Sequence, residues 1–358
     1  MARHDLLILT PQQMGLGRID RGERLDPAAI ERAVAKRRAL ARVNPDAVDL
    51  VEVRYFAAGE DYLPQDSPLW RRDKTGERVV SGGLIDGARH VYLLDFTKPE
   101  LQDSVAAQCK TYVETGVFDG CMFDWWNSAE SDIPGAEGTA RLAMIRKVRA
   151  AVGDKALLIG NVNDTLPKMT APYLNGVYME GVGAKGFASD WRRAAGNLAW
   201  LEAHLRPPAF TAMEVWYNCG KCAGDPAKIQ AQGRGELALM REATTLSLTN
   251  SDGYVLFSDP DILPTPDHLH NWYPFWNKSL GRPRGAKGAR LGNGAFFRAF
   301  DNGCVIFNPP DNRPAVVTFR SPHRSQASGV VAASQKVAAG DGDIFLSEGD
   351  ADACALAP

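Results

Sequence analysis

Hydrophobic residues along the first 260 positions alternate between short apolar runs and longer stretches with a helical period. Short apolar runs bounded by Gly, Asn, Asp or Pro are typical of strands covered on both faces in a parallel sheet. This pattern predicts eight strands, at 4–10, 46–55, 90–95, 121–124, 156–161, 175–180, 209–217 and 254–259.

The stretches between these runs carry apolar residues at helical spacing. They predict helices at about 26–43, 98–116, 137–152, 190–205 and 228–249. Asp26-Pro27 is a favourable cap and first-turn pair for the earliest of them. Residues 56–89 show no period, and a loop of this length is often part of a functional site.

Strands alternating with helices or long loops over about 260 residues indicate an α/β fold of the (β/α)8 TIM-barrel type. A doubly wound sheet is the alternative, but no GxGxxG sequence follows the first strand. From Leu291 the spacing changes to short strands and tight turns, at 295–300, 304–308, 315–319 and 343–346. We therefore expect a barrel domain at 1–285 and a small all-β, sandwich-like domain at 286–358, with a frayed tail from Gly349.

Polar residues recur at or near the C-terminal ends of successive predicted strands. In a barrel these ends converge on one face, where the active sites of this fold lie. Some of these residues could instead cap helices, but several are followed by more strand. The set consists of Glu52, Asp95, Asp124, Asn161, Glu180, Glu214 and Asp259.

Carboxylates accompanied by aromatic residues suggest glycoside hydrolysis, in which one carboxyl group protonates the leaving oxygen and another attacks or activates water. Sugar faces can lie on indole rings while their hydroxyls form hydrogen bonds. A non-catalytic carbohydrate-binding barrel is the alternative. The candidate substrate-binding residues are Tyr55, Trp125, Trp126, Asn161, Asn163, Trp216, Tyr217, Trp272 and Trp276.

Composition argues against nucleic-acid and membrane partners, whereas the acids and aromatics point to a carbohydrate substrate. With 41 basic and 43 acidic residues the formal net charge is −2, so no basic excess favours nucleic acid. No apolar run is long enough to span a bilayer. The first apolar run, at Leu6 to Leu9, leaves no room for a signal peptide before it, and both localisation and oligomeric state stay open.

Cysteine and histidine spacing gives no strong metal signal. The six cysteines are too few and too irregular for a disulfide scaffold, and Cys121 fits a core position. Cys219-x-x-Cys222 suits a loop disulfide or two free thiols. His268-x-His270 reads as a loop pair, so we expect neither a metal nor another cofactor.

Several separate motifs between Tyr92 and Pro283 resemble the putative glycoside hydrolases grouped as hypothetical glycosyl hydrolase family 15. They are LLDFTKPELQD, FDGCMFDWWN, IGNVND, APYLNGVYMEG, SLTNSDGYVLFSD and HNWYPFWNKSLGRP. More distantly, an acid after strand four and a Glu after strand six are similar to the polygalactosaminidase-like barrels of family 114. This resemblance implies Asp124 and Glu180 as the catalytic pair.

The residues themselves leave a second pairing open. Glu180 has the longer side chain and suits a general acid/base, while Asp124 suits a nucleophile or base. Glu214 is the alternative partner, since acids after strands four and seven also form pairs in barrels. Asp95 and Asp259 would then orient water or substrate hydroxyls, and Glu52 is a further supporting candidate.

Overall fold

The computed structural model describes residues 3–19, 24–81, 91–126, 136–183, 186–222, 224–260, 268–277, 279–347, 354 and 356. The end of the long loop, at 82–90, and most of the predicted frayed tail lie outside these residues. The chain divides into two compact units. Unit 1 comprises Met1–Tyr178 and His204–Phe210, and unit 2 comprises Met179–Ala203 and Thr211–Pro358.

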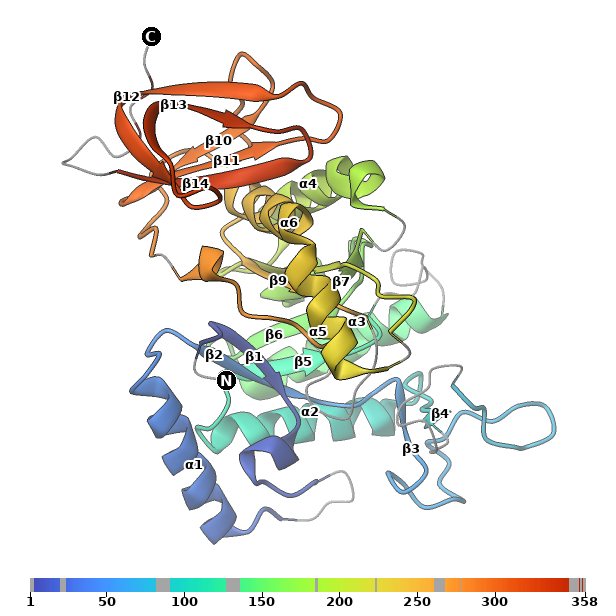
Figure 1. Cartoon of the computed structure of the whole chain (residues 1–358). Helices are drawn as coiled ribbons and strands as arrows, with labels where there is room; N and C mark the ends of the chain where they lie inside the picture. Colours follow the sequence, from blue (N-terminus) through green and yellow to red (C-terminus); the bar gives the residue numbers. More distant parts are fainter. Residues whose placement is uncertain are drawn as a thin grey trace. The chain divides into compact units, whose positions relative to one another are not determined.

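Seven strands in the described part of the chain form one sheet, in the order β1-β2-β5-β6-β7-β8-β9 (Figure 1). The pairs β1–β2, β2–β5, β5–β6, β6–β7 and β8–β9 are parallel. The strands are β1 (Leu6–Leu9), β2 (Val48–Glu52), β5 (Gly120–Phe123), β6 (Leu157–Asn161), β7 (Gly176–Val182), β8 (Phe210–Trp216) and β9 (Tyr254–Ser258). Together with an antiparallel sheet near the C-terminus, this sheet confirms the predicted fold class, an α/β barrel followed by all-β structure.

The predicted third strand does not join this sheet. Its residues form β4 (Val91–Leu93), which pairs antiparallel with β3 (Ala57–Gly59). The outer side of β4 is also occupied, because Arg71 donates a backbone hydrogen bond to the Leu93 carbonyl and the Leu93 amide donates to Val79. With both edges paired inside the long loop, β4 has no free edge to offer a barrel strand.

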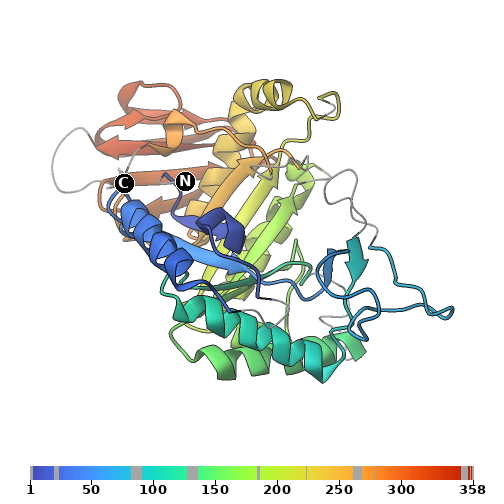
Figure 2. The same cartoon turned by 90° about the horizontal axis from the view of Figure 1, so that it is seen from below.

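Unit 1 contains the helices α1 (Pro27–Ala41), α2 (Pro99–Glu114) and α3 (Ala136–Val152). Asp26 caps α1 by accepting hydrogen bonds from the amides of Ala28 and Ala29, as its sequence predicts. The α2 and α3 helices run side by side (Figure 2). Leu50 on β2, Met122 on β5 and Ile159 on β6 form a core cluster.

Close strand pairing in unit 1 depends on a glycine. A Cβ atom at Gly120 would lie 1.7 Å from the backbone oxygen of Leu157 on the neighbouring strand. Any side chain at this position would push β5 and β6 apart. The DG turn therefore sets the approach of the strand that ends at Asp124.

Unit 2 holds most of α4 (Phe187–His204), then α5 (Pro226–Gly235) and α6 (Leu237–Asn250). The single helix predicted at 228–249 is wrong, because the chain breaks at Glu236, whose ψ of 44° is not helical. Gly235 precedes the break and lowers the cost of leaving the helix there. Asp225 caps α5 through the amides of Ala227 and Lys228.

The C-terminal strands form a five-stranded sheet in the order β10-β11-β14-β12-β13. They are β10 (Phe296–Ala299), β11 (Gly303–Asn308), β12 (Ala315–Ser325), β13 (Val331–Val337) and β14 (Asp341–Ser347). An Ala- and Ser-rich run at 327–339, for which the sequence predicts no strand, contains β13, whose backbone pairs with β12. Helix α6 packs on β14 and β11 (Figure 1). The domain boundary at 285/286 stays a prediction.

All six cysteines lie in disulfides, which join Cys109 to Cys121, Cys219 to Cys222 and Cys304 to Cys354. Cys121 is therefore cross-linked to Cys109 on α2. The sequence predicts the core position of Cys121 but not this disulfide. Among the described helices, none combines the length and apolarity needed to span a bilayer.

Candidate functional site

In unit 1, a polar network follows the ends of β5 and β6. The Asn161 side-chain amide donates to Asp124 Oδ1 at 2.8 Å. The Asn161 side-chain oxygen accepts from the Asn163 backbone amide at 3.2 Å. Asp124 is partly exposed, and its carboxylate is held by a neutral donor. Three predicted site residues are thus brought together, and Asp124 does not act as a cap in the described hydrogen bonds.

Trp125 follows Asp124 in a backbone conformation that is rare for a bulky residue, with φ of 56°. Its carbonyl accepts from the Tyr55 hydroxyl at 2.7 Å and from Arg141 at 3.4 Å. Burial raises the pKa of Tyr55 more strongly than the nearby Arg141 lowers it, so the hydroxyl stays a donor. Strained backbone of this kind concentrates at functional sites.

The Trp125 indole lies at the surface. The side chain is 38% exposed and stacks on Phe56, with ring centroids 5.5 Å apart and an interplanar angle of 16°. An exposed indole supported from behind by a second ring is a surface of the type that binds sugar faces. The prediction of Trp125 as a substrate contact is compatible with this position and stays a prediction.

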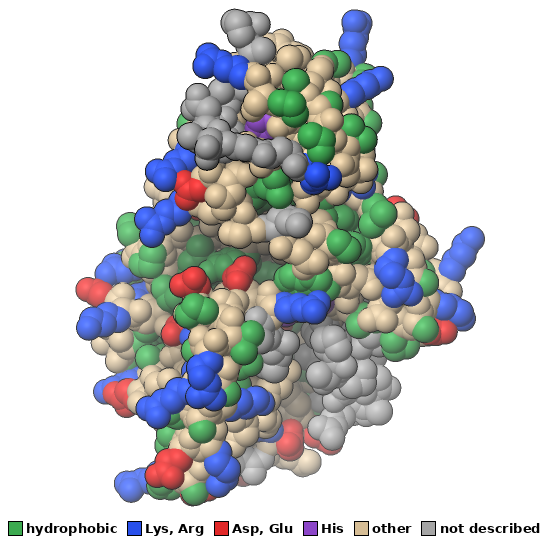
Figure 3. Space-filling view, turned by 60° about the vertical axis from the view of Figure 1, so that its left-hand side comes forward, with side chains coloured by type: hydrophobic (Ala, Val, Ile, Leu, Met, Phe, Trp, Pro, Cys, Tyr) green, Lys and Arg blue, Asp and Glu red, His purple; other side chains and the backbone are tan. Residues whose placement is uncertain are grey.

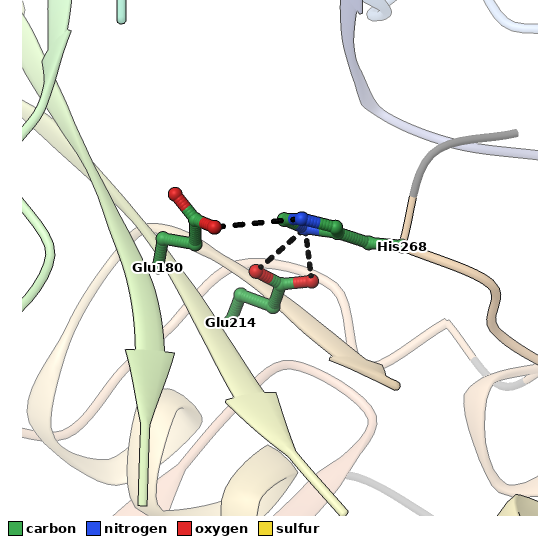
Figure 4. A group of neighbouring side chains, drawn as sticks. All are labelled: Glu180, Glu214 and His268. Atoms are coloured by element: carbon green, nitrogen blue, oxygen red, sulfur yellow. Dashed lines mark hydrogen bonds and ion pairs between the residues drawn. The ribbon is translucent and has the colours of Figure 1, made fainter. Parts of the chain in front are cut away.

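In unit 2, Glu180 on β7 and Glu214 on β8 meet at His268 (Figure 4). One carboxylate oxygen of each acid and one imidazole nitrogen lie within 4.8 Å of one another. His268 Nε2 lies 3.4 Å from Glu180 Oε1, and His268 Nδ1 lies 3.0 Å from Glu214 Oε1. The imidazole ring therefore stands between the two acids.

The two acids differ in accessibility. Glu214 is fully buried, and its Oε1 accepts a hydrogen bond from the Ser258 hydroxyl at the end of β9. The Glu180 side chain keeps 20% of its surface exposed. Of the pair, Glu180 alone has surface that a ligand can reach without rearrangement.

Aromatic and backbone features shape this cluster. The Trp216 ring lies edge-on to His268, with centroids 6.0 Å apart and an angle of 83°. Gly181 has φ of 74°, and a Cβ there would come within 3.0 Å of the Trp216 ring. Trp216 Nε1 is a buried donor without a hydrogen-bond partner among the described atoms. The absence of a side chain at Gly181, which follows Glu180, leaves the space that the Trp216 ring occupies beside the acids.

Three predicted acids have local structural roles in the described contacts. Asp259 is fully buried and accepts from the Cys219 amide at 2.7 Å, which anchors the disulfide loop. Asp95 follows β4, accepts from the Thr97 hydroxyl and pairs with Lys98 at 3.7 Å. Because β4 lies outside the barrel sheet, the prediction of Asp95 as a barrel strand-end acid is wrong. Glu52 pairs with Arg54 at 3.4 Å.

Three of the predicted sugar-binding aromatics are core residues. Trp126 has no exposed surface, and its Nε1 donates to the Thr170 hydroxyl at 2.9 Å. Tyr55 and Tyr217 are also buried, and the Tyr217 hydroxyl donates to backbone carbonyls. A buried ring offers no face to a ligand, so we remove these three from the candidate binding surface. Trp272 and Trp276 are half-buried and pack edge to face, 5.7 Å apart.

Two members of the unit 2 cluster, His268 and Ser258, were missed as site residues. Ser258 directly precedes Asp259 at the end of a predicted strand, a position that could have drawn notice. From its sequence context, His268 is interpreted as one histidine of a loop pair with His270. It reaches the acids from a segment of irregular structure, and sequence periodicity carries no signal for such a placement.

Glu180, Glu214 and His268 are also the described residues that could hold a metal ion. Both ring nitrogens of His268 already face carboxylate oxygens at 3.0–3.4 Å. A metal would need one of those nitrogens to turn its lone pair to the ion.

On the face drawn in Figure 3, basic, acidic and apolar side chains are interspersed.

The sequence matches no protein-family model and no curated protein. Similarity appears among solved structures. The chain is similar to a noncanonic maltogenic α-amylase, AmyB, from Thermotoga neapolitana, with 13% identity, coverage of 89% of this chain and 81% of that one, and a TM-score of 0.53. It is also similar to an α-amylase from Malbranchea cinnamomea, with 12% identity, coverage of 96% and 86%, and a TM-score of 0.51. At these identities the similarity establishes the fold.

Proposed function

We propose that the protein is a glycoside hydrolase that cleaves O-glycosidic bonds of a poly- or oligosaccharide, with Glu180 as its general acid/base. The observation that carries the proposal is the partly exposed Glu180 carboxyl near the end of a barrel strand, in contact with the His268 imidazole, whose other nitrogen contacts a second acid. Strand ends are where this fold places its chemistry. The solved structures with similar folds are amylases, which supports the same reaction class.

The second catalytic carboxyl is proposed to be Asp124. It follows β5, is partly exposed, and stands beside the strained, exposed Trp125. The distant similarity to the polygalactosaminidase-like barrels of family 114, an acid after strand four and a Glu after strand six, implies the same pair. Glu214 is the weaker candidate, because a fully buried carboxylate bonded to Ser258 cannot attack a sugar or activate a water in reach of one.

The proposal is tested by screening the purified chain on bacterial and plant polysaccharides for release of reducing ends. On a hydrolysed glycan, Glu180→Gln and Asp124→Asn should each lose about 10²- to 10⁴-fold in kcat. Glu114→Gln, at an exposed position on α2, is the matched control and should keep full activity. Circular dichroism and thermal unfolding verify that each variant is folded.

Particular outcomes overturn particular parts of the proposal. If Glu180→Gln keeps its turnover, Glu180 is not the acid/base. If Glu214→Gln abolishes turnover while Asp124→Asn does not, the pair is Glu180 and Glu214. Glycan binding without hydrolysis by the wild type would identify a non-catalytic carbohydrate-binding barrel. NMR of the first anomer released would distinguish retention from inversion.

A further inference from the structure

His268 contacts two different acids through its two different nitrogens. Nδ1 lies 3.0 Å from Oε1 and 3.1 Å from Oε2 of Glu214, while Nε2 lies 3.4 Å from Glu180 Oε1 (Figure 4). The imidazole thus bridges one buried and one partly exposed carboxylate. His268 itself has φ of 52°, so the backbone adopts an unfavourable conformation to put the ring there.

Glu214 determines which nitrogen carries the first proton. It is fully buried, and Ser258 donates a hydrogen bond to it, so its carboxylate is a fixed acceptor. A neutral imidazole has one N–H, and the hydrogen bond to a fixed acceptor selects the tautomer. The Nδ1–H form donates to Glu214, which leaves Nε2 facing Glu180.

Only certain proton arrangements satisfy the contact between Nε2 and Glu180. If Nε2 is protonated, the imidazolium faces a Glu180 carboxylate. If Nε2 is bare, it accepts from a protonated Glu180. Both favourable states hold one proton between the two groups, whereas a bare nitrogen facing a carboxylate places two acceptors against each other.

We propose that Glu214 and His268 act as a proton relay that keeps one proton available to Glu180, with His268 as a positioning residue that does not touch the sugar. This inference rests on the proposed role of Glu180. When Glu180 gives its proton to the glycosidic oxygen, its O–H bond breaks and the electron pair stays on the carboxylate. Nε2, which is bare while Glu180 holds the shared proton, then takes a replacement proton from solvent through the exposed surface of the ring, which is 15% of the side chain, and passes it to Glu180.

Among the described residues, titratable groups from three positions lie against His268 in the described contacts. They are Glu180 on β7, Glu214 on β8, and His270, whose Nδ1 lies 3.2 Å from the His268 carbonyl. The two acids contact the ring, while His270 contacts the backbone. Replacing either acid therefore changes the charge at the ring, and replacing His270 leaves both ring contacts in place.

The first test uses the full chain without substrate, so it does not depend on the proposed activity. Long-range ¹H–¹⁵N NMR of histidine-labelled protein, assigned with His268→Gln, reports the protonation of each ring nitrogen. We expect Nδ1 to stay protonated across the pH range in the wild type. Glu214→Gln should lower the pH at which the His268 ring is half-protonated by about one unit, and both neutral tautomers should then be populated. His270→Gln is the matched control and should leave the His268 resonances in place.

A bare Nδ1 in the wild type, or a ring insensitive to Glu214→Gln, would overturn the relay even if the enzyme hydrolyses glycans. A shift of the His268 resonances on titration with zinc chloride would also overturn it, because a bound metal would claim a ring nitrogen. If these signatures are found but no glycan is hydrolysed, the relay geometry stands and the proposed function fails.

The second test follows activity once a substrate is known. His268→Gly, chosen because glycine tolerates the positive φ, should lower kcat about 10- to 100-fold, change KM less and shift the pH profile of kcat. Added imidazole should restore part of the rate. Loss of activity with an unchanged pH profile and no imidazole rescue would indicate a purely structural histidine.

Discussion

Replacement of Glu242 by glutamine is expected to make the protein more stable at alkaline pH. Glu242 lies on α6, is 5% exposed, and its Oε1 has no hydrogen-bond partner among the described atoms. Burial, and secondarily the charge of Asp341, raises the pKa of Glu242 to about 8. The folded state therefore prefers the neutral carboxyl, and ionisation near neutral pH opposes folding.

The sign and size of the effect follow from proton linkage. Between an unfolded pKa of 4.5 and a folded pKa of about 8, the folded chain binds more protons at this site than the unfolded chain. The stabilisation from Glu242 is thus fully present below pH 4.5 and is lost as the pH rises to 8. The shift of about 3.5 units corresponds to an upper limit of about 5 kcal/mol, at a slope of at most about 1.4 kcal/mol per pH unit.

Urea denaturation at several pH values from 5 to 9 measures this contribution directly. The difference in unfolding free energy between Glu242→Gln and the wild type should grow with pH and level off above about 8. The constant cost of burying an amide cancels in that pH dependence. Glu114→Gln, exposed on α2, should show a small and flat difference. A flat difference for Glu242→Gln as well would refute the reasoning.

Three other substitutions test structural features of the fold and the site. Gly160→Ala should lower the unfolding free energy by about 1–3 kcal/mol, because its Cβ would lie 2.7 Å from the Trp126 ring; an unchanged urea midpoint would contradict the packing. Trp125→Gly should raise KM on the hydrolysed glycan without lowering thermal stability, since glycine relieves the φ of 56°; an unaltered KM would remove Trp125 from the binding surface. Serine at both Cys109 and Cys121 should cost about 2–4 kcal/mol of stability, and peptide mapping that finds these thiols free in the wild type would rule the disulfide out.

Local sequence determined most of the barrel. The strands ending near Asp124, Asn161 and Glu180 were predicted because apolar runs between turn residues have few alternatives when both faces are buried. The helix caps at Asp26 and Asp225 are also determined locally, since each cap side chain accepts from amides two or three residues further along the chain.

Tertiary structure decided what sequence spacing cannot encode. The 90–95 segment has strand composition, but pairing with β3 inside the long loop took it out of the barrel. The Ala- and Ser-rich 327–339 run has little strand propensity, and β13 forms there because β12 offers it an edge.

The candidate site divides in the same way. The positions of Asp124 just after β5 and of Glu180 near the end of β7 could be predicted, because each follows an apolar run that forms a strand. The solvent exposure of each side chain could not be predicted, since the burial of Glu214, Trp126 and Tyr217 depends on residues distant in the chain. His268 meets Glu180 and Glu214 across 88 and 54 residues. Only the folded chain fixes such a contact, because its energy depends on distance in space and not on separation in sequence.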